Sequence, residues 1–243
     1  MKNKLMQLLQ NNASKERKPL NLVKNEAGTD ATLYVYDIID SYWGVAAKDV
    51  ASLIAGLDQS MTLHVRINSP GGDVFEARAI STLIKEFGGK TVGHVDSLAA
   101  SAATTVALAC DEIIMSDGAY FMIHNAWSIA IGNKTDMQEM VALLTKMDGT
   151  IAGDYANKSG KSLEEIAQLM DDETWFTAQE ALDAGLVDSI AQTADKPSNA
   201  TGKQFNLTAY NRAPKALTEP PNDPDLSAIF ASNSRRLRLL SIT

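Results

Sequence analysis

The chain has 243 residues, a formal net charge of −8 and 45% hydrophobic residues, which is ordinary for a globular protein and enough for a sizeable core. The acidic balance argues against nucleic acid as the main partner, because binding to phosphates requires a basic patch. No segment approaches the roughly 20 apolar residues of a membrane span, and the first apolar run is too short and broken for a signal peptide, so we expect a soluble, cytoplasmic protein with no membrane partner.

Strand and helix patterns alternate along most of the chain after a polar N-terminal arm, residues 1–30. Strands are predicted by β-branched, aromatic or alternating runs at 31–39, 62–69, 90–96, 112–116, 120–124 and 185–190. Helical spacing of apolar residues predicts helices at 48–57, 74–89, from 102 onward and over about 135–158. This alternation predicts an α/β fold with right-handed crossovers.

Three capping boxes mark expected helix starts, pairing Thr135 with Gln138, Ser162 with Glu165 and Thr177 with Glu180. The methionine-rich stripe that follows the first box indicates packing rather than a cofactor site. From about residue 193 the composition turns to Pro, Asn, Thr and Asp. We therefore expect a single domain over residues 31–192, followed by a flexible C-terminal tail over residues 193–243.

The stretch "HVDSLAASAATTVALAC", residues 94–110, consists mostly of small residues and contains the only cysteine, Cys110. A cysteine in an apolar run is more often a small buried side chain than a reactive thiol. Ser101 lies among alanines, which favours close packing, and it is not in the Gly-x-Ser-x-Gly elbow of α/β-hydrolases. Composition alone therefore does not make Ser101 a nucleophile.

A serine nucleophile requires a base within hydrogen-bond distance. Of the three histidines, His64 and His94 lie inside strand patterns, whereas His124 ends the run "YFMIH". A side chain at a strand end can face a cleft, and this strand follows the Ser101 helix closely. We therefore expect Ser101 and His124 to be neighbours.

Acyl transfer also requires donors for the developing oxyanion. "INSPGGD" places Gly71 and Gly72 between a strand and a helix, where backbone N–H groups can reach a cleft without a Cβ in the way. The N–H that follows Ser101, at a helix start, is a second donor. A plain strand-to-helix turn is the alternative interpretation of the glycine pair.

These motifs in order ("INSPGG", a serine in "AAS" 29 residues after the second glycine, then "MIH") resemble the proteolytic subunit of the Clp protease, ClpP. "ETWFTAQEALDAGLVDSI" is similar to that family's closing segment, and the resemblance covers roughly residues 31–192. It implies a ClpP/crotonase-like fold, a spiral of ββα units, and a serine endopeptidase that acts on proteins or peptides.

The resemblance also assigns roles. It implies Ser101 as the nucleophile, His124 as the general base, and the backbone N–H groups of Gly72 and Ala102 as oxyanion donors. The family's acidic residue falls on Glu173, a departure from aspartate, with Asp172 as the runner-up. The peptide is expected to bind as an added strand along Gly71, Gly72, Asp73 and Val74.

No cofactor or metal is expected. The sequence holds no P-loop of the form Gly-x4-Gly-Lys-Ser/Thr, and its three histidines are too scattered for a metal site. Family members assemble into stacked heptameric rings, so the resemblance implies a homo-oligomer in which the region from residue 125 through the long helix joins two rings.

Three segments resemble the ClpP-related proteases of tailed phages. They are "SPGGDVFEA", "ETWFTAQEA" and, in the extra tail, "QFNLTAYNRAPKAL". That branch implies head maturation in the host cytoplasm, with scaffold or capsid precursors as substrates. One alternative is a bacterial housekeeping subunit that works with an ATP-driven unfoldase, and a second is a crotonase-fold acyl-CoA enzyme. Other readings are a membrane-attached Ser–Lys signal peptide peptidase, which would require Lys146, and an inactive scaffold.

Overall fold

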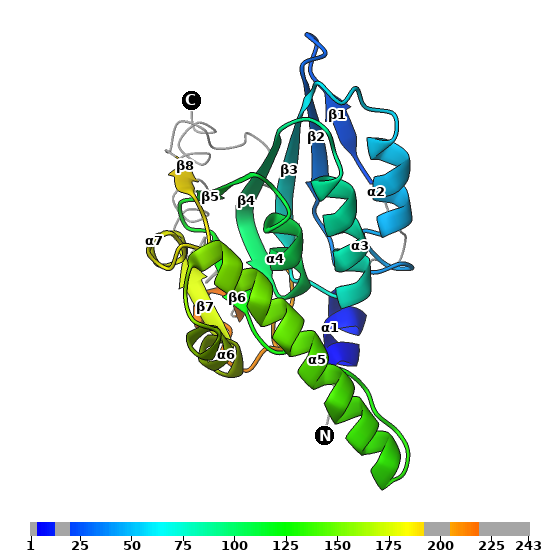
Figure 1. Ribbon diagram of the computed structural model, residues 1–243, viewed down its shortest axis with the longest axis vertical. Coiled ribbons are helices and arrows are strands. Elements are labelled where there is room, and N and C mark those ends of the chain that lie inside the picture. Colours follow the sequence, from blue (N-terminus) through cyan, green and yellow to red (C-terminus); the bar gives the residue numbers. More distant parts are fainter. Residues whose placement is uncertain (1–3, 13–19, 192–204, 219–243) are drawn as a thin grey trace, which may run out of the picture. The chain divides into compact units, whose positions relative to one another are not determined.

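A computed structural model describes residues 4–12, 20–191 and 205–218 of the chain. They fall into two compact units, Met1–Arg212 and Ala213–Thr243. Figure 1 shows the first unit, in which helices flank one β-sheet. The described part of the second unit contains helix α8 (Lys215–Thr218).

The sheet has eight strands in the order β1-β2-β3-β4-β5-β8, with β6 and β7 branching from β4. Pairing is parallel except between β1 and β2 and between β6 and β7. Helices separate most of the strands along the chain, which confirms the predicted α/β class. The strands are β1 (Leu22–Lys24), β2 (Asp30–Val35), β3 (Thr62–Ser69), β4 (Thr91–Ala100), β5 (Glu112–Ser116), β6 (Tyr120–Ile123), β7 (Thr174–Thr177) and β8 (Ser189–Ala191).

Strand β4 has two different neighbours on the same side. Its first half, from Val92 to Val95, pairs with β5, and its last residues, from Leu98 to Ala100, pair with β6. The sheet therefore divides along β4. The ends of β4 and β6 lie side by side at the branch, and this position is where the two chain segments that carry Ser101 and His124 meet.

The helices of the first unit are α1 (Lys4–Asn12), α2 (Ala47–Ile54), α3 (Val74–Lys85), α4 (Ala102–Ala107), α5 (Lys134–Ser159), α6 (Leu163–Asp171) and α7 (Ala178–Asp183). The capping boxes predicted for α6 and α7 are confirmed. The predicted pairing of Thr135 with Gln138 is wrong. Asn133 caps α5 instead, in a box with Asp136, because its side chain accepts the Thr135 N–H at 2.7 Å.

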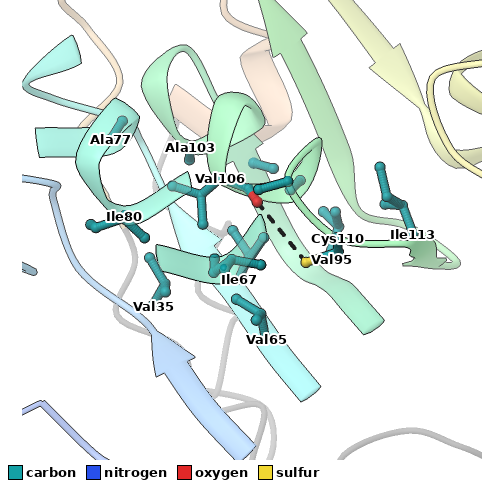
Figure 2. Packing of buried hydrophobic residues seen from close by; sticks show 14 of the residues in the cluster. Val35, Val65, Ile67, Ala77, Ile80, Val95, Ala103, Val106, Cys110 and Ile113 are labelled. Atoms are coloured by element: carbon teal, nitrogen blue, oxygen red, sulfur yellow. Dashed lines mark hydrogen bonds between the residues drawn. The ribbon is translucent and has the colours of Figure 1, made fainter. Parts of the chain in front are cut away.

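Helix α4 packs tightly between α3 and the sheet. Figure 2 shows Ala103 and Val106 of α4 close to Ala77 and Ile80 of α3 and above the apolar side chains of β3. On the β4 side, a Cβ at Gly93 would lie 3.2 Å from the Cys110 sulfur, so little free space remains. Cys110 is buried and burial raises its pKa to about 12, which agrees with a structural thiol.

Only the second half of α5 packs against the body. Ile151, Ala152 and Tyr155 are buried, whereas Met137, Val141 and Leu143 are exposed. Figure 1 shows the first half of α5 extending past the sheet. Within one chain the stripe is therefore buried only in the second half of the helix, and a packing role for its first half stays a prediction.

The compact unit extends beyond the expected boundary at residue 192. Phe205, Leu207, Ala209 and Tyr210 are buried, and Arg212 is the last residue of the unit. Helix α1 likewise gives structure to part of the expected N-terminal arm. The rest of the expected tail is described only as far as residue 218. In the described ranges, no helix is both long and apolar enough to cross a membrane.

The packing of α4 predicts that Ala103→Leu lowers the free energy of unfolding. The side chain is fully buried, and extra methylenes in a filled core typically cost about 1–3 kcal/mol. Urea denaturation measures the change. Ala55→Leu, at the exposed end of α2, serves as the control and should leave stability nearly unchanged. Equal losses in the two variants would contradict the tight packing of α4.

Candidate active site

Ser101 occupies the junction between β4 and α4 in a backbone conformation that is unusual for serine. Its φ and ψ are 55° and −126°, which a residue with a Cβ rarely adopts. Hydrogen bonds hold this conformation: the Ser101 N–H donates to Met122 O at 2.9 Å, and the Ser101 carbonyl accepts from the Thr104 N–H at 2.9 Å. The surrounding structure thus fixes the direction of the hydroxyl group.

His124 directly follows β6, and its Nε2 lies 2.6 Å from the Ser101 Oγ. The topology explains this distance. Ala100 at the end of β4 is in register with Met122 near the end of β6, and the two strands are parallel. The residues that follow the two strands are therefore brought together. The structure places Ser101 and His124 in the relation that a nucleophile and its base require.

The imidazole of His124 is buried and its pKa is lowered to about 3. Burial is the main cause, because it penalises the charged imidazolium, and the positive charge of Lys4 adds to it. The ring also lies edge-on to Trp127, with centroids 4.6 Å apart. The imidazole of His124 is thus neutral over nearly the whole pH range, and burial disfavours the imidazolium that proton uptake would form.

The glycine pair brings a second segment of backbone against Ser101. A Cβ at Gly71, where φ is +88°, would lie 2.6 Å from Ala100 O and 2.9 Å from the Ser101 Cβ. A Cβ at Gly72, where φ is +146°, would lie 2.1 Å from Ile39 O. Only residues without a side chain fit at these positions.

One edge of the backbone in this loop is hydrogen-bonded to Ile39, and the other edge faces away from it. The Ile39 N–H donates to Gly71 O at 2.9 Å, and the Asp73 N–H donates to Ile39 O at 2.8 Å. Because backbone groups alternate in direction along an extended segment, the N–H and C=O of Gly72 point away from Ile39. The Ala102 N–H belongs to the first residue of α4, where helix geometry supplies no intrahelical acceptor.

Asp73 is the last residue of this extended segment, and Val74 no longer belongs to it. Asp73 is the N-cap of α3, and its carboxylate accepts the N–H groups of Phe75 and Glu76 at 2.7 and 3.0 Å. Val74 is the first residue of that helix. An added peptide strand can therefore pair with the outward N–H and C=O of Gly72, because the Gly71 N–H donates to Ser69 Oγ and its C=O accepts from Ile39. The backbone enters helix α3 directly after Asp73.

The two candidate acids lie in different surroundings. Glu173 is buried, with φ of 49°, and its carboxylate accepts the N–H groups of Asn211 at 2.9 Å and Arg212 at 2.6 Å. Asp172 ends α6 near the surface and pairs with the Arg212 guanidinium at 2.8 Å. Within the described residues, no hydrogen bond joins either carboxylate to His124.

Three aromatic residues at the site carry no signal in the local sequence. The ring of Tyr210 lies against His124, Trp127 and Trp175, with centroids 5.4, 5.1 and 5.6 Å apart. Trp127 follows His124 in a loop, Trp175 is in β7, and Tyr210 comes from a segment expected to be a tail. Long-range packing brings them together, so no spacing rule indicates the cluster.

The other candidate chemistries find less support in the geometry. Lys146, which a Ser–Lys pair would require, is exposed on α5. Across the ranges that the structure describes, no group of three or more His, Cys, Asp or Glu side chains is arranged to hold a metal ion.

Comparisons with known proteins give a consistent result. A family model described as Clp protease matches residues 32–194. ATP-dependent Clp protease proteolytic subunit 1 of Protochlamydia amoebophila is 28% identical over 170 residues, covering 68% of this chain and 82% of that protein. The ATP-dependent Clp protease proteolytic subunit of Leuconostoc citreum is 30% identical over 161 residues, covering 63% and 80%. A solved structure of a ClpP1 mutant from Listeria monocytogenes has a TM-score of 0.58 at 26% identity, covering 68% of this chain and 93% of that one.

The burial of His124 predicts a pH-dependent contribution to stability. Between pH 6.5 and about 3 the unfolded chain binds a proton that the folded imidazole does not, so stability falls as the pH is lowered through this window. The slope for one such group approaches about 1.4 kcal/mol per pH unit. In His124→Gln this contribution is absent, so its unfolding free energy should fall less steeply on acidification than that of the wild type.

Urea denaturation at several pH values measures the difference. His94→Gln is the matched comparison, because burial lowers the pKa of His94 to about 4 and its window is therefore shorter. Stability curves of wild type and His124→Gln that run parallel from pH 7 to pH 3.5 would contradict the lowered pKa of His124.

Proposed function

Because this chain belongs to the Clp protease family, we propose that it is a serine endopeptidase with Ser101 as the nucleophile and His124 as the general base. The observation that carries the proposal is the 2.6 Å contact between Ser101 Oγ and His124 Nε2. Two strand ends and a strained backbone conformation position this pair, so it is a built feature of the fold.

In the proposed reaction, the Ser101 oxygen attacks a peptide carbonyl while His124 Nε2 takes up the hydroxyl proton. His124 then protonates the leaving amine, and an acyl-enzyme remains on Ser101. A water molecule, deprotonated by the neutral imidazole, releases the acid product and restores the serine. The buried, neutral state of His124 leaves its Nε2 lone pair available for the first step.

The N–H groups of Gly72 and Ala102 are proposed to stabilise the oxyanion. Gly71 lies in close backbone contact with Ser101, so the glycine loop borders the reacting atom. The outward N–H and C=O of Gly72 suit a substrate strand that adds to this edge. Preorganised donors of this kind contribute about 2.7–4 kcal/mol each to transition-state stabilisation.

Glu173 is the proposed acid of the triad, in preference to Asp172. Its carboxylate is buried on the same side as the rings around His124, whereas Asp172 is paired with Arg212 near the surface. A glutamate can hold the histidine tautomer as an aspartate does. In the structure the Glu173 carboxylate accepts the backbone N–H groups of Asn211 and Arg212 and, at 3.4 Å, the indole N–H of Trp175.

A ring-shaped homo-oligomer, heptameric or built of stacked rings, is part of the proposal. The exposed apolar side chains of the first half of α5, together with Ile131 in the preceding loop, lie in the region that the family resemblance assigns to ring-to-ring contact. Apolar side chains gathered on an exposed helix are typical of a surface that a second copy covers.

For the biological role, we propose head maturation of a tailed phage, with scaffold or capsid precursor proteins as substrates. The resemblance of "SPGGDVFEA" and "ETWFTAQEA" to phage proteases, and the extra residues beyond 193, support this role. The alternative is a proteolytic subunit that works with an ATP-driven unfoldase. The similarity to ATP-dependent Clp protease proteolytic subunits supports this alternative.

The proposed chemistry predicts that a fluorophosphonate probe labels Ser101 covalently. Mass spectrometry follows the labelling to completion. Labelling should be absent in Ser101→Ala. In His124→Gln its rate should be at least about 100-fold lower, because general-base catalysis contributes about 10²–10⁴-fold. Labelling elsewhere, or acyl-CoA binding by a folded protein that the probe never labels, would instead support the acyl-CoA enzyme.

The proposed role predicts processing of head proteins. Co-expression of the wild type with the capsid and scaffold proteins of a tailed phage should shorten at least one of them, as seen by intact-mass measurement. Ser101→Ala is the control that should leave them uncut. Identical products with both chains would contradict the head-maturation role without contradicting the peptidase chemistry.

A further inference from the structure

Residues 205–212, "FNLTAYNR", form a segment that contacts His124, Glu173 and Asp172 of the candidate site. We call it the C-terminal segment. Four of its side chains are buried, those of Phe205, Leu207, Ala209 and Tyr210, although composition predicts a tail. The segment contains a turn at residues 208–209, in which the Tyr210 N–H donates to Leu207 O at 3.0 Å, and it places the ring of Tyr210 against His124.

Tyr210 fills the space beside the general base. Its ring lies among the rings of His124, Trp127 and Trp175, which we call the aromatic enclosure. Its hydroxyl donates to the carbonyl of Pro70, directly before the glycine pair. Burial raises the pKa of Tyr210, and a hydrogen bond with the Ser101 side chain acts in the opposite direction. The side chain thus reaches from the base to the nucleophile and the start of the glycine loop.

The backbone after Tyr210 is held by the two candidate acids. Glu173 accepts the N–H groups of both Asn211 and Arg212, and Asp172 pairs with the Arg212 guanidinium at 2.8 Å. A buried carboxylate that accepts two backbone N–H groups makes charge-assisted bonds, which are among the stronger hydrogen bonds in proteins. The segment therefore engages the same carboxylate that the proposed triad requires.

Helix α1 holds the other end of the segment. Asn12 donates to Asn206 O at 2.9 Å and accepts the Asn206 N–H at 2.7 Å, so one side-chain amide binds both backbone groups of that residue. Lys4 bonds to Asn211 and lies 5.8 Å from the centre of the Trp127 ring. Backbone recognition by side-chain amides depends little on the identity of the bound residue, whereas the aromatic enclosure selects a ring.

We propose that the C-terminal segment is a tethered peptide ligand of this site. The aromatic enclosure binds an aromatic side chain, which is Tyr210 in the resting chain and a tyrosine or phenylalanine of the substrate once the segment has left. This inference rests on the proposed peptidase function and adds to it both a substrate preference and a built-in competitor.

Two physical arguments favour this assignment over a purely structural role. A substrate side chain cannot enter the aromatic enclosure while Tyr210 fills it, because the ring is in van der Waals contact with three others. A tethered ligand also acts at an effective concentration of about millimolar, so even modest intrinsic affinity keeps the site closed. Release exposes His124 and frees the Glu173 carboxylate in one event.

The test compares full-length wild type with Tyr210→Ala and Tyr210→Phe, with Tyr42→Ala as the matched control because Tyr42 is exposed. The rate of fluorophosphonate labelling of Ser101 should rise about tenfold or more in Tyr210→Ala if at least nine-tenths of wild-type molecules are closed. Tyr210→Phe, which keeps the ring and loses the bond to Pro70, should give a smaller rise. Tyr42→Ala should match the wild type.

The substrate preference is tested on Tyr210→Ala with synthetic peptides. The peptide FNLTAYNR should inhibit labelling competitively, and the same peptide with alanine in place of tyrosine should not. Matched substrates that differ in one residue should show a lower KM with tyrosine or phenylalanine than with alanine. Equal inhibition by both peptides would overturn the aromatic preference. Equal labelling rates in folded wild type and Tyr210→Ala would overturn the occlusion.

A second measurement separates this inference from the proposed function and covers the case in which Tyr210→Ala fails to fold. Hydrogen exchange of the Asn211 and Arg212 amides in the wild type should accelerate when excess FNLTAYNR is added, because the free peptide displaces the tethered copy. If no variant is labelled at Ser101 but this acceleration occurs, the peptidase proposal fails and the ligand assignment stands. If the exchange of both amides stays unchanged at saturating peptide, the tethered-ligand proposal is overturned.

Discussion

The backbone of Gly71 lies so close to the junction of β4 and α4 that a Cβ would meet Ala100, Ser101 and Ala102 at 2.6 to 3.0 Å. This contact depends on the parallel pairing of β3 with β4, which ends at Ser69 and Ala99. It sets where the glycine loop passes, and the loop in turn sets where α3 begins. One close approach of two chain segments therefore positions the proposed nucleophile, the proposed oxyanion donors and the edge proposed for the substrate.

Burial of His124 in this arrangement lowers its pKa and so weakens it as a base. A general base works best when its pKa lies near the working pH, so burial in the closed site disfavours uptake of the Ser101 proton by His124. The surrounding aromatic rings keep it neutral, with a pKa of about 3. Part of this cover is Tyr210, so the electrostatic state of the base depends on a segment far away in the sequence.

Local patterns predicted the elements better than the site. The run "TLHVRINS" matches β3 residue for residue, because its side chains alternate between the sheet's two faces. The cap of α5 was misplaced since Asn133 and Thr135 both suit an N-cap and only tertiary geometry selects Asn133. The sequence was sufficient to anticipate the meeting of Ser101 and His124. The sequence could not predict that Tyr210 packs among aromatic rings, because contacts between distant segments produce no periodic pattern in the sequence.

The amide pair between Asn12 and Asn206 joins two positions 194 residues apart along the chain. Contacts of such long sequence separation form late, because the entropy of closing the intervening loop must be overcome first. During synthesis, α1 emerges before its partner Asn206, which is made 194 residues later. By then β4, β6 and β7 have already left the ribosome. We therefore expect each new chain to bring Ser101 and His124 together before the C-terminal segment packs on them. Every molecule would then pass through a stage in which this pair is exposed.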